Sequence, residues 1–147
     1  MFGSEERSDV ISRVEAHLRR EFPRLSFERD GKSLRVPPGG DSGFQVELVD
    51  AGQEVVPVLG GWVAYGLDED QAVPLFLAGV AGAARVREVS RANVAYRWTV
   101  EVRRDDAWVS EGNHYSVPLF GGAVPLFGRK RERILWNDPN RLGKATG

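Results

Sequence analysis

The sequence predicts an α+β domain in which two helices pack on one face of an antiparallel sheet. Residues 4–22 and 69–84 carry apolar side chains at the three- and four-residue spacing of a helix. The residues that follow each segment alternate between apolar and polar side chains and are broken by turn-forming residues, which is typical of strands. The order helix, meander, helix, meander favours helices that cover an antiparallel sheet built from the two meanders.

The first predicted helix, residues 4–22, has an amphipathic pattern. Its apolar stripe consists of Val10, Ile11, Val14, Leu18 and Phe22. Charged residues fill most of the other positions, so the stripe must lie on an apolar surface. Ser4 or Ser8 is the expected N-cap, and Pro23 ends the helix.

The first predicted meander follows this helix. Asp30-Gly31 has the composition of a two-residue hairpin turn between short strands at residues 25–27 and 34–36. Further along, the odd and even positions of residues 44–49 point to opposite faces, with Phe44, Val46 and Leu48 on the apolar side. A second apolar stretch, residues 54–65, completes this meander.

The second helix and second meander complete the predicted fold. The acidic residues Asp68 to Asp70 suit a helix N-terminus, and the helix over 69–84 is apolar nearly all round. Residues 94–103 then alternate without a miss, which predicts a half-buried strand. Residues 85–91 and 107–110 are expected to pair with it.

Length and composition bound the class of protein. A chain of 147 residues with 41% hydrophobic and 28% charged side chains suits a single globular domain over 1–147, with a flexible tail from about residue 138. Zero cysteine excludes disulfides and thiolate metal sites. The excess of arginine over lysine is typical of a GC-rich, bacterial coding sequence. The charged N-terminus and the absence of a long apolar run predict a cytoplasmic location.

The sequence does not favour an enzyme. It holds two histidines, His17 and His114, without the spacing of a metal site, and it has no nucleophile or nucleotide-binding motif. We therefore expect no catalytic residues, no cofactor, no metal and no small-molecule ligand. A cofactor-free enzyme that uses His114 beside Glu111 is the third alternative.

An uncharged segment from Tyr115 to Gly128 is the first candidate for an interaction surface. It contains the near-repeat Val-Pro-Leu-Phe-Gly twice, with Phe120 and Phe127 at equivalent positions. Such an apolar segment can cover the core, bind a second subunit or another protein, or contact a membrane surface. The leading hypothesis is a small noncatalytic protein that acts through protein–protein contacts or self-association at this segment.

A basic run follows this segment directly and is the second candidate. It consists of Arg129, Lys130, Arg131 and Arg133, interrupted by Glu132. With Trp136 nearby it could bind an anionic surface, either nucleic acid or a membrane, through phosphate contacts and one stacking ring. The alternation over residues 132–136 instead indicates a strand with a solvated start, and we place the anionic partner second to a protein partner.

The net charge of -1 conceals a strong polarity along the chain. Residues 36–84 carry seven acidic and no basic side chains, whereas residues 85–147 carry twelve basic and seven acidic ones. Folding could join the two regions through ion pairs, or it could leave two surfaces of opposite sign that steer a charged partner.

Overall fold

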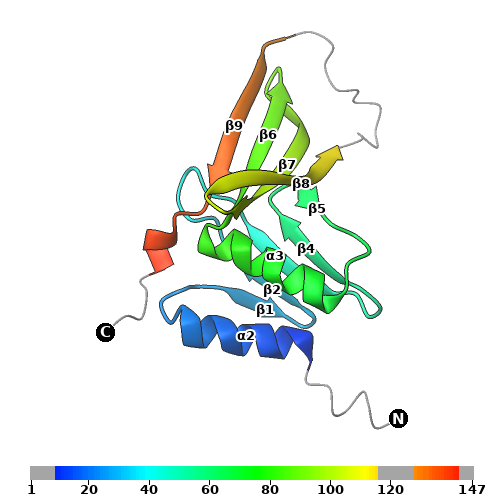
Figure 1. The fold of residues 1–147 in the computed structure, drawn as a ribbon, viewed down its shortest axis with the longest axis vertical. Helices are drawn as coiled ribbons and strands as arrows, with labels where there is room; N and C mark the ends of the chain where they lie inside the picture. The colour runs from blue at the N-terminus through cyan, green and yellow to red at the C-terminus, as the bar shows by residue number, and fades with distance from the viewer. Residues whose placement is uncertain (1–8, 116–127, 143–147) are drawn as a thin grey trace.

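The computed structural model describes residues 9–115 and 128–142, and it confirms the α+β class (Figure 1). The described elements are, in chain order, α2 (Val10–Glu21), β1 (Glu28–Asp30), β2 (Ser33–Val36), β3 (Val46–Asp50), β4 (Val55–Leu59), β5 (Trp62–Val63), α3 (Glu69–Ala81), β6 (Ala84–Arg91), β7 (Val94–Arg104), β8 (Ala107–Tyr115), β9 (Lys130–Trp136) and the 3-10 helix η1 (Pro139–Leu142).

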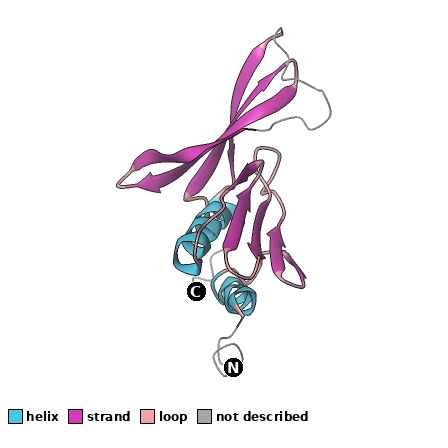
Figure 2. Ribbon diagram, turned by 90° about the vertical axis from the view of Figure 1, so that its right-hand side faces the viewer, coloured by secondary structure: helices cyan, strands magenta, loops and turns pink. Residues whose placement is uncertain are grey.

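The two meanders form two separate antiparallel sheets (Figure 2). Sheet A has the strand order β1-β2-β3-β4-β5, and sheet B has the order β8-β7-β6-β9. The sequence pattern predicts one sheet built from both meanders, and in this respect the structure differs, because each meander has the same alternation whether it joins the other or forms its own sheet. In the structure β5 is only two residues long, and the chain then enters α3, so sheet A ends before sheet B begins.

Both helices pack on the same face of sheet A, as the sequence predicts. The register places Leu34, Leu48 and Pro57 side by side on this face, with buried valines in the neighbouring rows. The helix α2 lies against β2 and β3, and α3 lies against β3 and β4. A single cluster of buried side chains joins both helices to both sheets and includes Val86 and Leu135 of sheet B.

The ends of the first elements differ slightly from the predicted ones. The N-cap of α2 is Asp9, whose side chain accepts a hydrogen bond from the backbone N–H of Ile11 at 3.1 Å, so neither serine fills this position. Residues 4–8 of the predicted helix lie outside the described residues. The first hairpin turn consists of Gly31 and Lys32, one residue later than expected, because Gly31 adopts the left-handed conformation with φ of 56°.

The second helix begins at Glu69 as expected but ends at Ala81, three residues early. Asp68 and Gln71 form a capping box at its start. Gly82 ends it with a left-handed φ of 81°, after which β6 begins.

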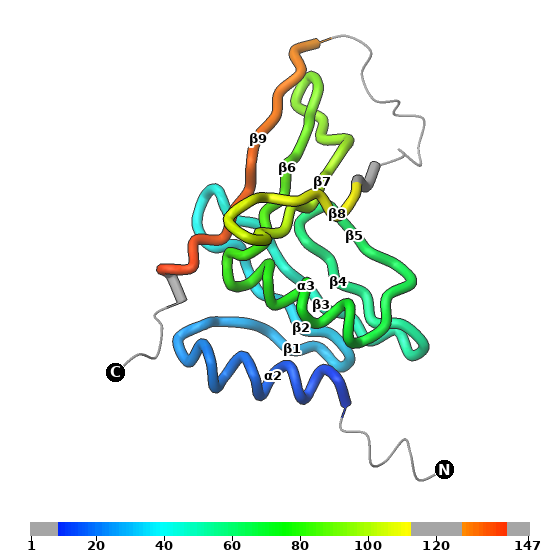
Figure 3. Tube along the Cα trace, viewed as in Figure 1, coloured from blue at the N-terminus to red at the C-terminus, as the bar shows by residue number. Residues whose placement is uncertain are grey.

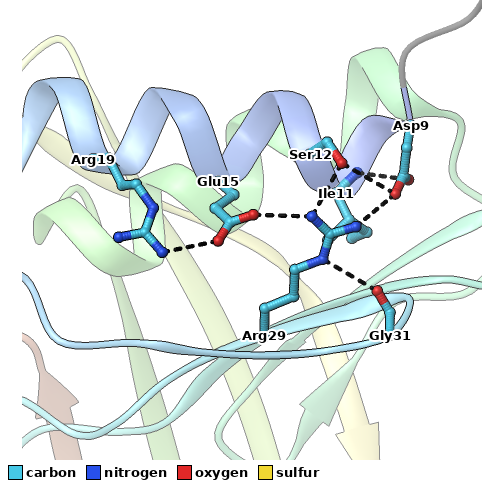
Figure 4. A network of polar contacts seen from close by, with 7 residues as sticks. All are labelled: Asp9, Ile11, Ser12, Glu15, Arg19, Arg29 and Gly31. Atoms are coloured by element: carbon cyan, nitrogen blue, oxygen red, sulfur yellow. Dashed lines mark hydrogen bonds and ion pairs between the residues drawn. The ribbon is translucent and has the colours of Figure 1, made fainter.

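An arginine of β1 fixes α2 against sheet A (Figure 4). The guanidinium of Arg29 donates to Asp9 at 2.8 Å and to Glu15 at 2.9 Å. Arg19 donates to the other carboxylate oxygen of Glu15 at 3.0 Å, and its guanidinium lies 5.0 Å from the ring centroid of Phe27. Hydrogen bonds from Arg19 and then Arg29 lower the pKa of the Glu15 carboxyl.

Sheet B stands on top of the helix-covered sheet and extends away from it (Figures 1 and 3). The rows near α3, with Val86 and Val100, are fully buried. By contrast, Val94 at the start of β7 is 47% exposed. The apolar side chains predicted to be buried over residues 94–103 are therefore buried only in the second half of this segment. A bulge at Tyr96 interrupts the pairing of β7 with β6. At this end of the sheet, the β6–β7 turn residues Ala92 and Asn93 and the adjoining Val94 are exposed.

Candidate functional site at the distal end of sheet B

The distal end of sheet B, named here for its position farthest from the helices, holds the β6–β7 turn and the first residues of β9 (Figure 3). Ala92 and Asn93 form that turn, both with positive φ. The backbone N–H of Ala92 donates to the carbonyl of Arg129 at 3.2 Å, so the turn and the start of β9 lie side by side. The predicted basic run therefore falls at this end.

The basic run lies on an edge strand, which divides it between two faces. Residues 130–136 form β9, as the alternation over 132–136 predicts, and β9 pairs only with β6 among the described strands. Arg131 and Arg133 are opposite Ser90 and Glu88. They lie on the inner face of the sheet, which is the face that contacts the core where the sheet approaches α3. Lys130 points to the outer side. The run is therefore not one patch, and cations project from both faces of the edge.

A surface hollow of about 600 Å³ lies at this end, on the inner side. Its lining residues come from β6, the β6–β7 turn, β7 and β9, and they are Glu88, Ser90, Asn93, Ala95, Arg129, Lys130, Arg131, Glu132 and Arg133. The hollow thus combines cationic groups with a hydroxyl and a carboxamide, the groups that commonly hold phosphate or carboxylate oxygens.

The carboxylates of the hollow are already engaged. Glu88 accepts hydrogen bonds from the indole of Trp98 at 3.0 Å and from the Nε of Arg133 at 2.9 Å. Glu132 forms an ion pair with Arg87 of β6. This hydrogen bond from Arg87 lowers the pKa of the Glu132 carboxyl and raises the pKa of the guanidinium. Glu132 also interacts electrostatically with Lys130 and Arg97, but among the described residues neither carboxylate forms an ion pair with Arg129, Lys130 or Arg131.

Three cations remain available. Arg129, Lys130 and Arg131 are exposed. Within residues 9–115 and 128–142, the structure gives their side chains neither an ion pair nor a hydrogen bond. Arg133 differs from them because Glu88 holds it. Of the four predicted basic residues, three are therefore exposed and have no ion pair among the described residues.

The hollow contains residues that the sequence analysis did not single out. Ser90 and Asn93 have no motif around them, and they join the basic residues only through pairing of strands about 40 positions apart. The turn at Ala92 and Asn93 carries a weak signal, because Asn tolerates positive φ. Nothing in the linear sequence indicates that this turn lies beside Arg129.

The other predicted candidates have different positions. Phe120 and Phe127 lie outside the described residues. His17 lines a groove of about 280 Å³ between α2 and α3. His114 belongs to β8, opposite Trp98 in the register.

The carboxylate proposed as a catalytic partner for His114 has another role. Glu111 accepts a hydrogen bond from Arg104 at 2.8 Å, across the pairing of β7 and β8. In the part of the chain that the structure describes, no group of three or more His, Asp or Glu side chains could hold a metal ion.

The charge polarity of the sequence persists as separate surfaces. Five arginines of sheet B have ion pairs with carboxylates of the same sheet or of its β7–β8 turn; they are Arg85, Arg87, Arg103, Arg104 and Arg133. The acidic residues Asp68, Glu69 and Asp70 stand at the start of α3, far from the distal end of sheet B (Figure 1). Cationic groups thus dominate one end of the molecule.

Comparisons with family models, with curated proteins and with solved structures find no match to this chain. None of the described helices is long and apolar enough to span a bilayer. The inference about function therefore rests on the geometry and charge of the chain's own residues.

Proposed function

We propose that the protein is a noncatalytic binding protein that contacts an anionic partner through the distal end of sheet B. The observation that carries this proposal is the set of exposed cations Arg129, Lys130 and Arg131 around a hollow whose carboxylates are engaged by other residues. Phosphate or carboxylate groups of a partner would supply the missing negative charge.

Protrusion of the sheet supports a binding role. Residues on both faces of the edge strand β9 are exposed, from Lys130 and Arg131 at the distal end to Ile134, which is 42% exposed. A partner can therefore approach from either face of the edge without displacing part of the core. A stable sheet rather than a loop would hold the cations in place, which reduces the entropy lost on binding.

The noncatalytic part of the proposal rests on what surrounds the charged groups. General acid–base chemistry needs a proton-transfer group whose pKa is near the working pH. The Glu132 carboxyl has its pKa lowered by Arg87, which is the opposite of what a general acid requires. Glu88 is likewise occupied as a hydrogen-bond acceptor.

The test is binding of a simple polyanion at several salt concentrations. We expect the intact chain to bind inorganic polyphosphate with an affinity that falls as salt rises, because bound cations are released from the polymer. The single variants Arg131→Ser and Lys130→Ser should each weaken binding and reduce the slope of log K against log salt by about one.

Two matched controls are available on sheet A and its connection to α2. Lys32 lies in the β1–β2 turn and Arg24 follows α2, and both are exposed and distant from sheet B. Lys32→Ser and Arg24→Ser remove the same net charge without touching the distal end. If these controls weaken binding as much as the variants of the distal end, or if no salt-dependent binding occurs at all, the proposal is wrong.

A protein partner or a second copy at the uncharged segment stays a second candidate, because the fourteen residues from Tyr115 to Gly128 carry no charge. Replacing Phe120 and Phe127 together by aspartate should then lower the mass measured by light scattering. An unchanged mass with unchanged unfolding would contradict it. A bacterial source and a cytoplasmic location also remain predictions from the sequence.

A further inference from the structure

The outer face of sheet B, which points away from the core, carries a row of aromatic and basic side chains. Strand pairing defines this face: Arg85 of β6 lies opposite Glu101 of β7 and opposite Trp136 of β9. Trp108 of β8 is opposite Arg103, two residues from Glu101, and so it shares the face. The row therefore crosses the sheet from one edge strand to the other.

Side-chain contacts hold this row in place. The guanidinium carbon of Arg85 lies 4.2 Å from the ring centroid of Trp108, which is a cation–π contact. The Nε of Arg85 donates to Glu101 at 2.7 Å. The indole N–H of Trp136 donates to the carbonyl of Gly82 at 2.8 Å while its side chain remains partly exposed. Two aromatic rings are thus fixed on this face, where Trp136 is exposed and Trp108 half-buried, whereas Val89 and Thr99 of the same face are buried.

The same face carries more cations than carboxylates. Its charged strand residues are Arg85, Arg87, Arg91, Arg97, Arg103 and Lys130, against Glu101 and Glu132. Both carboxylates pair with arginines of β6. The Nε of Arg97 is buried and has no hydrogen-bond partner among the described residues.

We propose that this face, together with the distal end of sheet B, binds single-stranded nucleic acid. The inference rests on the proposed function and names the class of anionic partner. Unpaired bases would stack on Trp108 and Trp136, and phosphates would meet Lys130 and Arg97. Trp136 and Lys130 are six residues apart on β9, about 20 Å along the strand, so rings and cations could contact successive parts of one extended chain.

The alternative anionic partners fit this face less well. A polyphosphate or an acidic peptide would satisfy the cations but would make no use of two partly exposed indole rings. A duplex keeps its bases stacked on one another, so they are not available to the rings. The combination of stacking rings and an excess of cations over carboxylates on one face therefore favours unpaired bases on a phosphate backbone.

The test compares polymers that share charge but differ in bases. Oligothymidylate of about 12 nucleotides and inorganic polyphosphate of equal charge are titrated against the intact chain, with tryptophan fluorescence and anisotropy as readouts. We expect the oligonucleotide to bind about tenfold more tightly than polyphosphate and to quench tryptophan emission. The corresponding duplex should bind about as weakly as polyphosphate.

Variants separate stacking from charge. Trp108→Leu should weaken oligothymidylate binding about tenfold and leave polyphosphate binding unchanged. Tyr65 is a matched aromatic control, since it is 70% exposed and lies just after β5, so Tyr65→Leu should change neither. Unfolding curves establish that each variant is folded. Trp136→Leu provides a second stacking variant, for which the hydrogen bond to Gly82 makes that check necessary.

The outcomes distinguish the two proposals. Equal affinity for oligothymidylate and polyphosphate, with no effect of Trp108→Leu on either, would overturn the nucleic-acid inference and leave the anionic binding function intact. If neither polymer binds in a salt-dependent manner, both proposals are wrong. If oligothymidylate quenches tryptophan emission and Trp108→Leu abolishes this quenching, both proposals are supported.

Discussion

Asn137 makes two hydrogen bonds with the backbone of Phe44: its Oδ1 accepts from the N–H at 3.0 Å, and its Nδ2 donates to the carbonyl at 3.0 Å. The same carboxamide accepts from the N–H of Gly39 at 3.0 Å and donates to the carbonyl of Gly79 at 3.1 Å. Asn137 is fully buried. It therefore joins the end of β9 to α3 and to the loop that leads into β3.

Replacing this residue should destabilise the whole fold. Asn137→Ala would leave backbone groups of Gly39, Phe44 and Gly79 buried without partners, and each such group costs about 1–3 kcal/mol. We expect a loss of about 3 kcal/mol or more in the free energy of unfolding, measured by urea denaturation. Asn140→Ala, at an exposed position of η1, is the control and should change it by about 0.5 kcal/mol or less.

Asn137→Asp refines this prediction. The carboxylate keeps the two acceptor bonds but cannot donate to Phe44 and Gly79, and it buries a charge. It should be at least as destabilising as the alanine variant at neutral pH. A variant with unchanged stability would show that the junction tolerates unsatisfied polar groups.

The close approach of the two sheets gives a second prediction. A Cβ added at Gly61 would lie 2.3 Å from the indole ring of Trp98, well inside contact distance. Gly61→Ala must therefore move the ring, and with it the hydrogen bond from Trp98 to Glu88. We expect a loss of about 2 kcal/mol or more in unfolding free energy and an altered near-ultraviolet circular dichroism spectrum.

A glycine with open space serves as the control. An added Cβ at Gly52 meets nothing within 4 Å, and only the positive φ of 94° opposes a side chain. Gly52→Ala should cost about 1 kcal/mol and leave the near-ultraviolet spectrum unchanged. Equal losses in both variants would show that backbone strain rather than contact with Trp98 decides the effect.

Acid should weaken the attachment of α2 through Glu15. Arg19 and Arg29 lower the pKa of this carboxyl in the folded state below the unfolded value of about 4.3. The stabilisation is thus complete above pH 5 and is lost as pH falls through the folded-state pKa. Glu15→Gln should lower stability by about 1 kcal/mol at pH 7 and by nothing once pH is below the folded-state pKa.

Denaturation of wild type and Glu15→Gln at a series of pH values measures this difference. Glu21→Gln, at the exposed end of α2, provides the matched control on the same helix. The difference in unfolding free energy between wild type and Glu15→Gln could instead be independent of pH. The stabilising effect of Glu15 would then come from packing or neutral hydrogen bonds and not from its charge.

Much of the secondary structure could be predicted because its determinants are local. The alternation of Phe44, Val46 and Leu48 is buried as expected, and the apolar stripe of α2 faces sheet A. Asp68 caps α3 as an acidic residue at a helix start should. In each case the signal and its cause lie within one turn or one strand.

The arrangement of the sheets and the site depends on distant pairs. Asn137 and Phe44 are separated by 93 positions in the sequence. The local sequence Asn-Asp-Pro is the same whether the asparagine is buried or lies in an exposed turn, so it does not indicate that Asn137 is buried. Likewise, alternation predicts β9 but does not say that β6 is its neighbour. The neutralisation of Glu88 by Arg133 follows from that pairing alone, so sequence could indicate the cations but not which of them remain free.

Removing a carboxylate from the outer face of sheet B tests the electrostatic part of both proposals. Glu132→Gln removes one of the two carboxylates that pair with Arg87, leaves the pair with Glu101, and raises the net charge of the face by one. This change strengthens the attraction to nearby phosphates, and solvent and salt screen the effect because Glu132 is exposed. We expect affinity for polyphosphate and oligothymidylate to rise about two- to fivefold at low salt, with a smaller gain at higher salt. Since Arg87 lowers the pKa of Glu132, wild-type binding should not gain from protonation of this group between pH 7 and pH 5.

Glu28→Gln breaks the exposed pair with Arg35 on sheet A and is the control. An equal gain from Glu28→Gln would mean that net charge alone, and not the outer face of sheet B, attracts the polymer.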